Sequence, residues 1–255
     1  MDVLERHNRI VEEAKRDGRV MVDDLATLFA VTPQTIRKDL SDLCDAGVLK
    51  RIHGGALFPS GVENMEYEAR RQIARAEKDA IGQAAAKLIP NNASLFINIG
   101  TTTEAVGRAL LDHVGLMVIT NNINVANRMR VYPTLEVVIA SGVVRTSDGG
   151  IVGEAAVDFI KQFKVDYAVI GVSAIDDDGA LLDFDFREVK VAQAIIANAR
   201  HVILVSDSTK FERTAPVRIG HLSQVDTFIT DRCTVDSIRT ICAESDVALV
   251  ETTES

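Results

Sequence analysis

The first fifty residues carry short runs of apolar positions whose spacing predicts helices. Apolar residues recur at three- and four-residue steps from Val3 onward, which predicts an amphipathic helix that ends near Gly18. The segment 19–22 is expected to form a short strand. A second apolar face, over 23–30, predicts another helix, and Asp23 is expected to be its N-cap.

A third helix is predicted from Pro33 to about Ala46. Thr32 provides a cap hydroxyl, and a proline at the first helical position loses no hydrogen bond. Gly47 stands where a left-handed residue ends a helix. The predicted buried stripe consists of Ile36, Leu40 and Leu43. Two short helices joined by a tight turn predict a helix-turn-helix motif.

The segment 48–58 predicts a wing, because two short strands flank His53, Gly54 and Gly55. Residues 1–58 are therefore expected to form a winged helix-turn-helix domain. The apolar stripe is lost after this segment, so 59–76 is expected to be a partly helical linker. A second domain is expected over 77–255.

The second domain alternates strand-like and helix-like runs. Runs rich in valine and isoleucine predict strands at 94–99, 117–120, 135–141, 166–175, 201–207 and 227–231. Helical patterns lie between and after them, at 104–111, 124–129, 155–163, 187–199 and 235–244. This alternation is typical of an α/β fold with a mostly parallel sheet covered on both faces.

The third helix has an outward face suited to DNA. Its polar residues can contact base edges and phosphates in the major groove, and the wing adds cations beside a glycine turn. A solvated polar face on a small helical bundle is the alternative, and it would be preferred for the helix alone. The expected DNA contacts are Thr32, Gln34, Thr35, Arg37, Lys38, Ser41, Lys50, Arg51 and His53.

A second polar feature follows the first strand of the larger domain. Gly100, Thr101, Thr102 and Thr103 precede a helix expected to begin near Glu104, where hydroxyls and a helix N-terminus favour a phosphate. A helix cap with spare threonines is the alternative. No Walker A or G-x-G-x-x-G pattern is present, so neither ATP nor NAD is expected, and we expect no cofactor.

Further polar residues follow other predicted strands, where parallel sheets bind ligands. Asn121, Gly149, Gly150 and Lys210 fit a sugar-phosphate site, although turn residues and a surface lysine are the alternatives. Asp183, Asp185 and Glu188 could support proton abstraction together with Lys210, but an acidic loop is the preferred interpretation. The histidines have no metal-ligand spacing, so we expect no metal.

Charge and composition are compatible with this organisation. The net charge is −9, but residues 1–58 hold nine basic and ten acidic side chains, so the excess of acid lies in the second domain. Three cysteines without Cys-x-x-Cys spacing favour reduced thiols in a cytoplasm. We expect no signal peptide and no membrane span, because no long apolar run occurs.

These segments together resemble a known family. The sequences TPQTIRKDLSDL and RIHGGA, followed by IGTTTEAV, TNNINVAN, SDGGIVGEA and DSTKF, resemble the DeoR family of bacterial repressors over nearly the whole chain. The stretches DGGIVGEA, LDFDFREV and ARHVILVSD are most similar to its glycerol 3-phosphate-responsive branch. Asn98 stands where the family often has aspartate, and Thr209 where serine is usual.

The resemblance implies a sensor fold similar to ribose-5-phosphate isomerase and coenzyme A transferases. It implies that the effector pocket is lined by Gly100, Thr101, Thr102, Asn121, Gly149, Gly150, Glu188 and Lys210. The expected function is a repressor that binds double-stranded operator DNA and is released by a small phosphorylated metabolite, glycerol 3-phosphate being preferred. A homodimer or tetramer is expected through the second domain. The alternative function is a phosphosugar isomerase-like enzyme, which would explain only the second domain.

Overall fold

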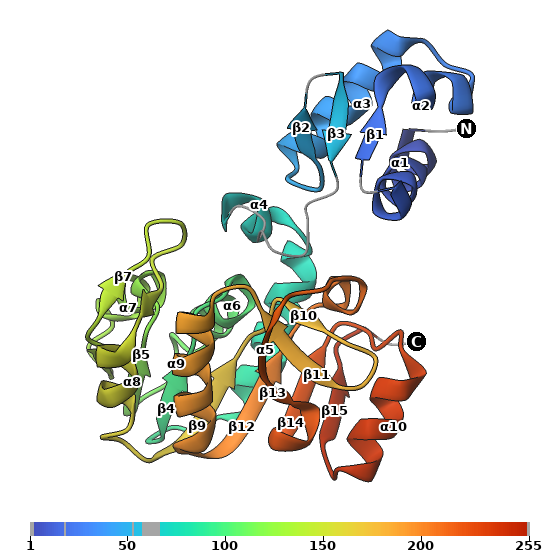
Figure 1. Cartoon of the computed structure of the whole chain (residues 1–255). Coiled ribbons are helices and arrows are strands. Elements are labelled where there is room, and N and C mark those ends of the chain that lie inside the picture. The colour runs from blue at the N-terminus through green and yellow to red at the C-terminus, as the bar shows by residue number, and fades with distance from the viewer. Residues whose placement is uncertain (1–2, 18, 53, 58–66, 254–255) are drawn as a thin grey trace. The chain divides into compact units, whose positions relative to one another are not determined.

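The protein divides into two compact units, Met1–Ile73 and Ala74–Ser255 (Figure 1). The structure is a computed structural model that describes residues 3–17, 19–52, 54–57 and 67–253. Each unit is described by itself. No helix among the described residues is long and apolar enough to span a membrane.

The first unit is a winged helix-turn-helix. Its elements are α1 (Val3–Asp17), β1 (Arg19–Met21), α2 (Val22–Phe29), α3 (Pro33–Asp45), β2 (Lys50–Ile52), β3 (Gly55–Leu57) and α4 (Tyr67–Gln72). The strands form an antiparallel sheet in the order β1-β3-β2. The predicted stripe of Ile36, Leu40 and Leu43 is buried in a core shared with α1 and α2, so the amphipathic prediction is confirmed.

The predicted N-cap of the second helix is wrong. Helix α2 begins at Val22, and Met21 occupies the cap position without a side-chain hydrogen bond. The Val22 N–H instead donates to the Gly54 carbonyl at 2.9 Å. Because the wing backbone already accepts from this first amide, the chain passes from strand to helix without a capping side chain. Asp23 lies in the first helical turn, next to the positive end of the helix dipole.

In the second unit, seven described strands form one parallel sheet in the order β15-β14-β12-β9-β4-β5-β6. These strands are β4 (Ser94–Ile97), β5 (Leu116–Thr120), β6 (Leu135–Ile139), β9 (Val165–Ile170), β12 (Ala199–Val205), β14 (Thr227–Thr230) and β15 (Ala248–Glu251). The predicted parallel α/β architecture is confirmed. The strand order reverses between β4 and β9, and open α/β sheets bind ligands at such a reversal.

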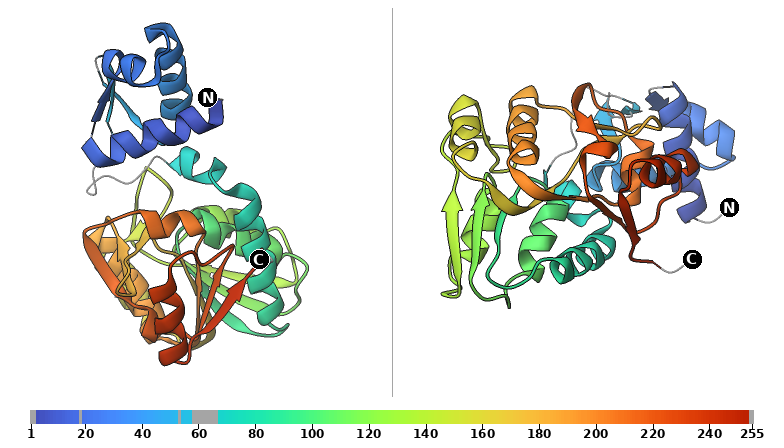
Figure 2. Two further views of the ribbon diagram at one scale, coloured as in Figure 1. Left: turned by 90° about the vertical axis from the view of Figure 1, so that its right-hand side faces the viewer. Right: turned by 90° about the horizontal axis from the view of Figure 1, so that it is seen from below.

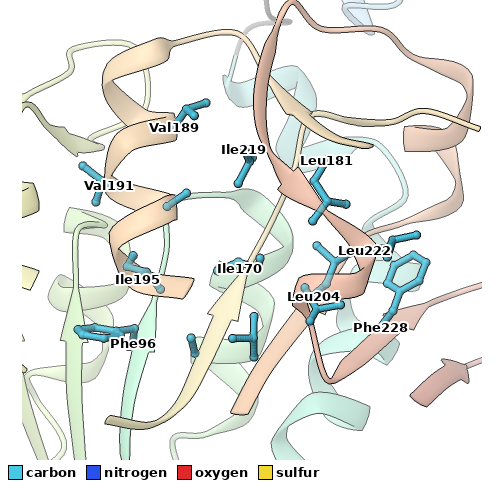
Figure 3. Packing of buried hydrophobic residues seen from close by; sticks show 14 of the residues in the cluster. Phe96, Ile170, Leu181, Val189, Val191, Ile195, Leu204, Ile219, Leu222 and Phe228 are labelled. Atoms are coloured by element: carbon cyan, nitrogen blue, oxygen red, sulfur yellow. The ribbon is translucent and has the colours of Figure 1, made fainter. Parts of the chain in front are cut away.

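Helices cover both faces of this sheet (Figure 2). The helices are α5 (Arg75–Leu88), α6 (Thr101–Ala109), α7 (Ile123–Met129), α8 (Glu154–Ile160), α9 (Phe186–Ala197) and α10 (Asp236–Glu244). Strand alternation explains the two layers, because Leu95 and Ile97 pack with α5, α6 and α7, whereas Phe96 packs with α8 and α9. Figure 3 shows Phe96 in the same cluster as Val191 and Ile195 of α9. Both faces of the sheet are covered by apolar side chains, so the sequences of the strands are continuous hydrophobic runs.

One predicted strand of the second unit needs correction. The predicted strand 166–175 is two strands, β9 and β10 (Ala174–Ile175), because the chain leaves the sheet at Gly171, which lies against Thr103. Helix α5 begins inside the expected linker, and β15 was not predicted. Smaller antiparallel pieces complete the unit, namely β7 (Val143–Val144) with β8 (Ile151–Val152), and β10 with β11 (Ala180–Asp183) and β13 (Val217–His221), while short 3-10 turns cover Ser208–Glu212 and Leu222–Gln224.

Candidate DNA interface and strand-end site

Helix α3 presents polar side chains on the face opposite its buried stripe. Gln34, Arg37 and Lys38 are exposed, while Thr35 and Ser41 are half-buried. The exposed Thr32 caps the helix as predicted, because its hydroxyl accepts from the Thr35 N–H at 3.2 Å. The expected contact residues of α3 therefore form one accessible surface.

The wing buries Gly55 against β1 and exposes its cations. A side chain at Gly55 would lie 2.1 Å from the Val20 carbonyl oxygen, and Gly54 has a left-handed φ of +77°. Lys50 and Arg51 are exposed. Arg51 Nη2 donates to Ser41 Oγ at 2.7 Å, so this wing residue also orients the wing against α3. The predicted contact at position 53 lies outside the described residues.

Sequence reasoning missed the group that holds α3 in place. Asp39 lies on the inner side of α3 and is 2% exposed. Arg6 of α1 donates to both of its carboxylate oxygens, at 2.6 and 3.0 Å, and His7 adds a contact at 3.1 Å. Burial raises the pKa of Asp39, but the hydrogen bonds from Arg6 and His7 outweigh it and hold this pKa below its usual value. An acid within an otherwise apolar stripe was the available signal.

In the second unit, the residues expected to bind an effector gather at the carboxyl ends of the strands. Gly100 follows β4, Asn121 follows β5 and Lys210 follows β12. Strand order places β4 between β5 and β9, and β12 beside β9. The sheet therefore carries these residues along a single edge, at the reversal of strand order.

The glycine–threonine segment is the start of a helix rather than a loop before one. Helix α6 begins at Thr101, three residues before the predicted start, and Gly100 occupies its N-cap with φ +145°. Thr103 donates its hydroxyl to the carbonyls of Asn98 and Gly100, at 2.7 and 2.8 Å, which fixes this early start. Thr102 is buried and Thr101 is half-buried in the same turn.

Asn121 is fully buried, at 0% exposure, and its Oδ1 atom has no hydrogen-bond partner. Its Nδ2 donates to the Ile151 carbonyl at 3.2 Å. The predicted glycines lie close to Asn121, because Gly150 forms an antiparallel β-bridge with the neighbouring Asn122. A Cβ atom at Gly150 would lie 3.2 Å from the Ile99 side chain. An unpaired buried acceptor costs roughly 1–3 kcal/mol, so Asn121 is suited to accept from a ligand hydroxyl.

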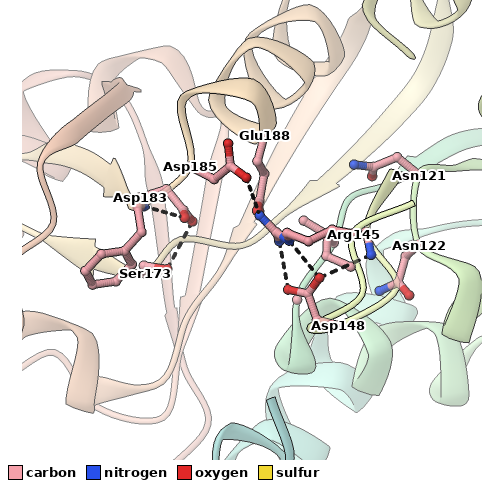
Figure 4. A network of polar contacts seen from close by, with 12 residues as sticks. Asn121, Asn122, Arg145, Asp148, Ser173, Asp183, Asp185 and Glu188 are labelled. Atoms are coloured by element: carbon pink, nitrogen blue, oxygen red, sulfur yellow. Dashed lines mark hydrogen bonds and ion pairs between the residues drawn. The ribbon is translucent and has the colours of Figure 1, made fainter. Parts of the chain in front are cut away.

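Arg145 organises a partly buried network that the sequence did not predict (Figure 4). It donates twice to Asp148, at 2.8 and 2.7 Å. It also donates to Asp185 at 3.2 Å and to Glu188 at 2.5 Å. Asp183 is buried nearby, and its carboxylate accepts a hydrogen bond from the Ser173 hydroxyl at 3.0 Å. The acidic-loop interpretation of residues 183–188 is wrong, because Asp183 and Glu188 are buried.

Glu188 differs from its neighbours in its pKa. Burial and the adjacent Asp183 carboxylate raise the pKa of Glu188 to about 8, against the opposing effect of Arg145. The hydrogen bonds from Arg187 lower the pKa of Asp185 to about 2. The two carboxyl groups therefore differ in charge at neutral pH, although they share Arg145.

The raised pKa of Glu188 makes the stability of the protein depend on pH. A carboxyl group with a raised native pKa holds its proton in the folded state, so stability falls as pH rises from about 4.5 toward 8. We expect Glu188→Gln, which mimics the protonated form, to reduce this fall in thermal stability. Melting curves between pH 5 and about 9 measure it. Exposed Glu154→Gln is the control, and equal slopes for wild type and Glu188→Gln would contradict the assignment.

Lys210 is 8% exposed, which contradicts its alternative interpretation as a surface lysine. The Asp207 carboxylate, 0% exposed, interacts electrostatically with both Lys210 and Lys78. Lys78 was not predicted, although its spacing from Ile81 and Ala85 places it on the buried face of α5. The described residues contain no cluster of three or more His, Cys, Asp or Glu suited to a metal ion.

A winged helix-turn-helix followed by an α/β unit with polar strand ends defines a DNA-binding regulator with a sensor domain. Residues 6–62 match the DeoR-like helix-turn-helix domain, and residues 73–232 match the DeoR C terminal sensor domain. The chain belongs to the DeoR family and is a transcriptional repressor.

Its relatives agree with this assignment. The glycerol-3-phosphate regulon repressor of Escherichia coli is 47% identical over 91% of this chain and 92% of that protein. The protein so named from Haemophilus influenzae is 48% identical over 88% of each chain. Because such relatives are repressors, the isomerase-like alternative is not supported. A ribose 5-phosphate isomerase from Methanocaldococcus jannaschii aligns over 54% of this chain and 55% of its own, with 14% identity and a TM-score of 0.41.

Proposed function

We propose that a small phosphorylated metabolite releases this repressor from operator DNA by binding at the strand-end site, and that glycerol 3-phosphate is this effector. The buried, unpaired Oδ1 of Asn121 is the observation that carries the proposal. The names of the relatives at 47% and 48% identity support the choice of ligand.

The arrangement supplies different groups for the two ends of such a ligand. The N-terminus of α6 and the ammonium group of Lys210 would attract the phosphate. Thr101 and Thr102 would donate hydroxyls to it, whereas the Thr103 hydroxyl proton is already engaged. Asn121 would accept from a ligand hydroxyl beside Gly149 and Gly150, and Glu188 would orient this region through Arg145.

A titration of operator binding against glycerol 3-phosphate tests this proposal on the full chain. We expect the effector to weaken operator binding by roughly 5- to 150-fold, the usual size of allosteric coupling. Inorganic phosphate and glycerol, used separately, are the controls. If neither glycerol 3-phosphate nor other small sugar phosphates weaken operator binding, the proposed effector site is wrong.

We also propose which segment of the chain carries out each function. Residues 1–58 would contact DNA, 59–76 would connect the units, and 77–255 would sense the effector and form a homodimer or tetramer. Ile139 is exposed on β6, the edge strand of the sheet, and Val143 and Val144 are exposed on β7. These apolar side chains would suit contact with a second copy of the chain. Light scattering on the full chain measures the oligomeric state. The repressor would act in the cytoplasm, on its operator.

Arg37 is the residue of α3 that we expect to read a base. Its guanidinium is exposed on the outward face, and a bidentate contact to guanine is worth about 1–3 kcal/mol. Arg37→Ala should therefore weaken binding to the operator more than binding to random DNA of equal length. Arg51→Ala, which removes a wing cation, should weaken both alike. Gel-shift titrations at fixed salt compare them, and equal losses for Arg37→Ala on both DNAs would exclude base readout.

A further inference from the structure

Lys78 is a buried lysine with an acidic partner from a distant part of the chain. It lies in the first turn of α5, is 3% exposed, and its Nζ lies 3.8 Å from Oδ2 of Asp207. A buried ammonium group is costly unless it is paired, so this contact needs a reason beyond packing. Lys78 belongs to none of the expected effector contacts.

The contact is an ion pair without a hydrogen bond. At 3.8 Å it exceeds hydrogen-bond distance, and Asp207 Oδ2 accepts no hydrogen bond. The other oxygen of Asp207 accepts from the hydroxyl of Thr209. An ion pair of this kind can be exchanged for a stronger acceptor, and a phosphate carries more charge and more acceptor oxygens than a carboxylate.

The packing of α5 against α6 brings Lys78 toward the proposed phosphate position. A side chain at Gly82 would lie 2.7 Å from the carbonyl group of Ala105, so the two helices touch closely at this point. Both helices begin at the carboxyl edge of the sheet, because Lys78 contacts Asp207, the second residue after β12, and α6 follows β4. Lys78 precedes Gly82 by one turn, and Thr101 precedes Ala105 by one turn. The turn of Lys78 therefore lies beside the first turn of α6.

Helix α5 is also the first element after the division between the two units. The division falls between Ile73 and Ala74, and Ala74 adopts a left-handed conformation with φ +50° at the N-cap of α5. The Lys78 N–H donates to the Ala74 carbonyl at 2.9 Å. The backbone of Lys78 is therefore hydrogen-bonded to the first residue after the division between the two units.

We propose that Lys78 couples effector binding to DNA release. In the DNA-bound state Lys78 pairs with Asp207, and the phosphate of the effector draws its ammonium group away, which shifts the first turn of α5 and the junction at Ala74. A ligand changes an equilibrium only through different contacts in the two states, and this exchange of partners is such a difference. The inference rests on the proposed effector site.

Two substitutions in the full chain give opposite expected results. Lys78→Met removes the charge, so saturating glycerol 3-phosphate should no longer weaken operator binding, and effector affinity should fall. Asp207→Asn removes the competing carboxylate, so it should weaken operator binding without effector and bind the effector more tightly. Lys87→Met, an exposed lysine of the same helix, is the matched control and should behave as wild type. Gel shifts give operator affinity, and calorimetry with glycerol 3-phosphate gives effector affinity.

The outcomes separate the coupling role from the effector site. If Lys78→Met still releases the operator to the wild-type extent at saturation, Lys78 does not couple the two sites. If Lys78→Met fails to fold in a melting experiment, Asp207→Asn decides, and unchanged operator and effector affinities would overturn the proposal. If wild type itself fails to bind glycerol 3-phosphate, the effector assignment fails together with the coupling.

Discussion

Replacing Asp39 with alanine is expected to unfold much of the DNA-binding unit. Arg6 is itself buried, and it donates to both oxygens of Asp39. Removing one partner of a buried ion pair costs about 3–5 kcal/mol. That cost is comparable to the whole stability of a domain of this size. Operator binding should be lost, since α3 would no longer be held against α1.

Asp42→Ala is the matched control, because Asp42 is an exposed acid on the same helix. A surface substitution of this kind is expected to change stability by no more than about 0.5 kcal/mol. Urea unfolding of the full chain, followed by circular dichroism, compares the variants. If Asp39→Ala unfolds at the same urea concentration as Asp42→Ala, the ion pair with Arg6 does not position the recognition helix.

Lys210→Ala is expected to give a repressor that binds operator normally but needs far more effector for release. A hydrogen bond to a charged group is worth about 1.5–3 kcal/mol, which corresponds to effector affinity weaker by roughly 10- to 140-fold. Lys210 is buried after β12 and belongs to the sensor unit, so operator affinity without effector should not change. The measurement is the effector concentration that gives half release.

Lys210→Ala and Lys78→Met should differ in the extent of operator release at saturating effector. Lys210→Ala should still reach full release at high effector concentration, because it loses affinity rather than coupling. Lys190→Ala, an exposed lysine on α9, is the control. Half release of Lys210→Ala at the wild-type effector concentration would show that this lysine does not contact the phosphate.

Local sequence patterns were sufficient to predict structure where the interacting residues are close to one another in the sequence. The hydroxyl of Thr32 caps a helix that begins at the next residue, and Gly47 adopts the left-handed conformation expected after that helix, with φ +69°. The runs of valine and isoleucine predicted the parallel sheet, because both of its faces are covered. The prediction for the start of α6 was wrong, since Thr103 bonds back to Asn98 and Gly100 and extends the helix toward the strand.

The candidate site was predictable in its residue types but not in its arrangement. Glycines and polar residues after strands indicated Gly100, Asn121 and Lys210 from the sequence. Their order along the sheet edge depends on β4 lying between β5 and β9, which no local pattern encodes. The absence of a hydrogen-bond partner for Asn121 Oδ1 likewise becomes visible only when the surrounding chain is in place.

The sequence by itself determined the winged helix-turn-helix, the α/β sensor fold and the family, because periodicity, caps and motifs are local signals. Only the tertiary structure decided which charges are paired. Asp39 pairs with Arg6 across 33 positions of the sequence, and Asp185 pairs with Arg145 across 40. Such pairs form because a buried charge must be compensated wherever folding places it, and the folded packing, rather than sequence spacing, decides which partner is within reach.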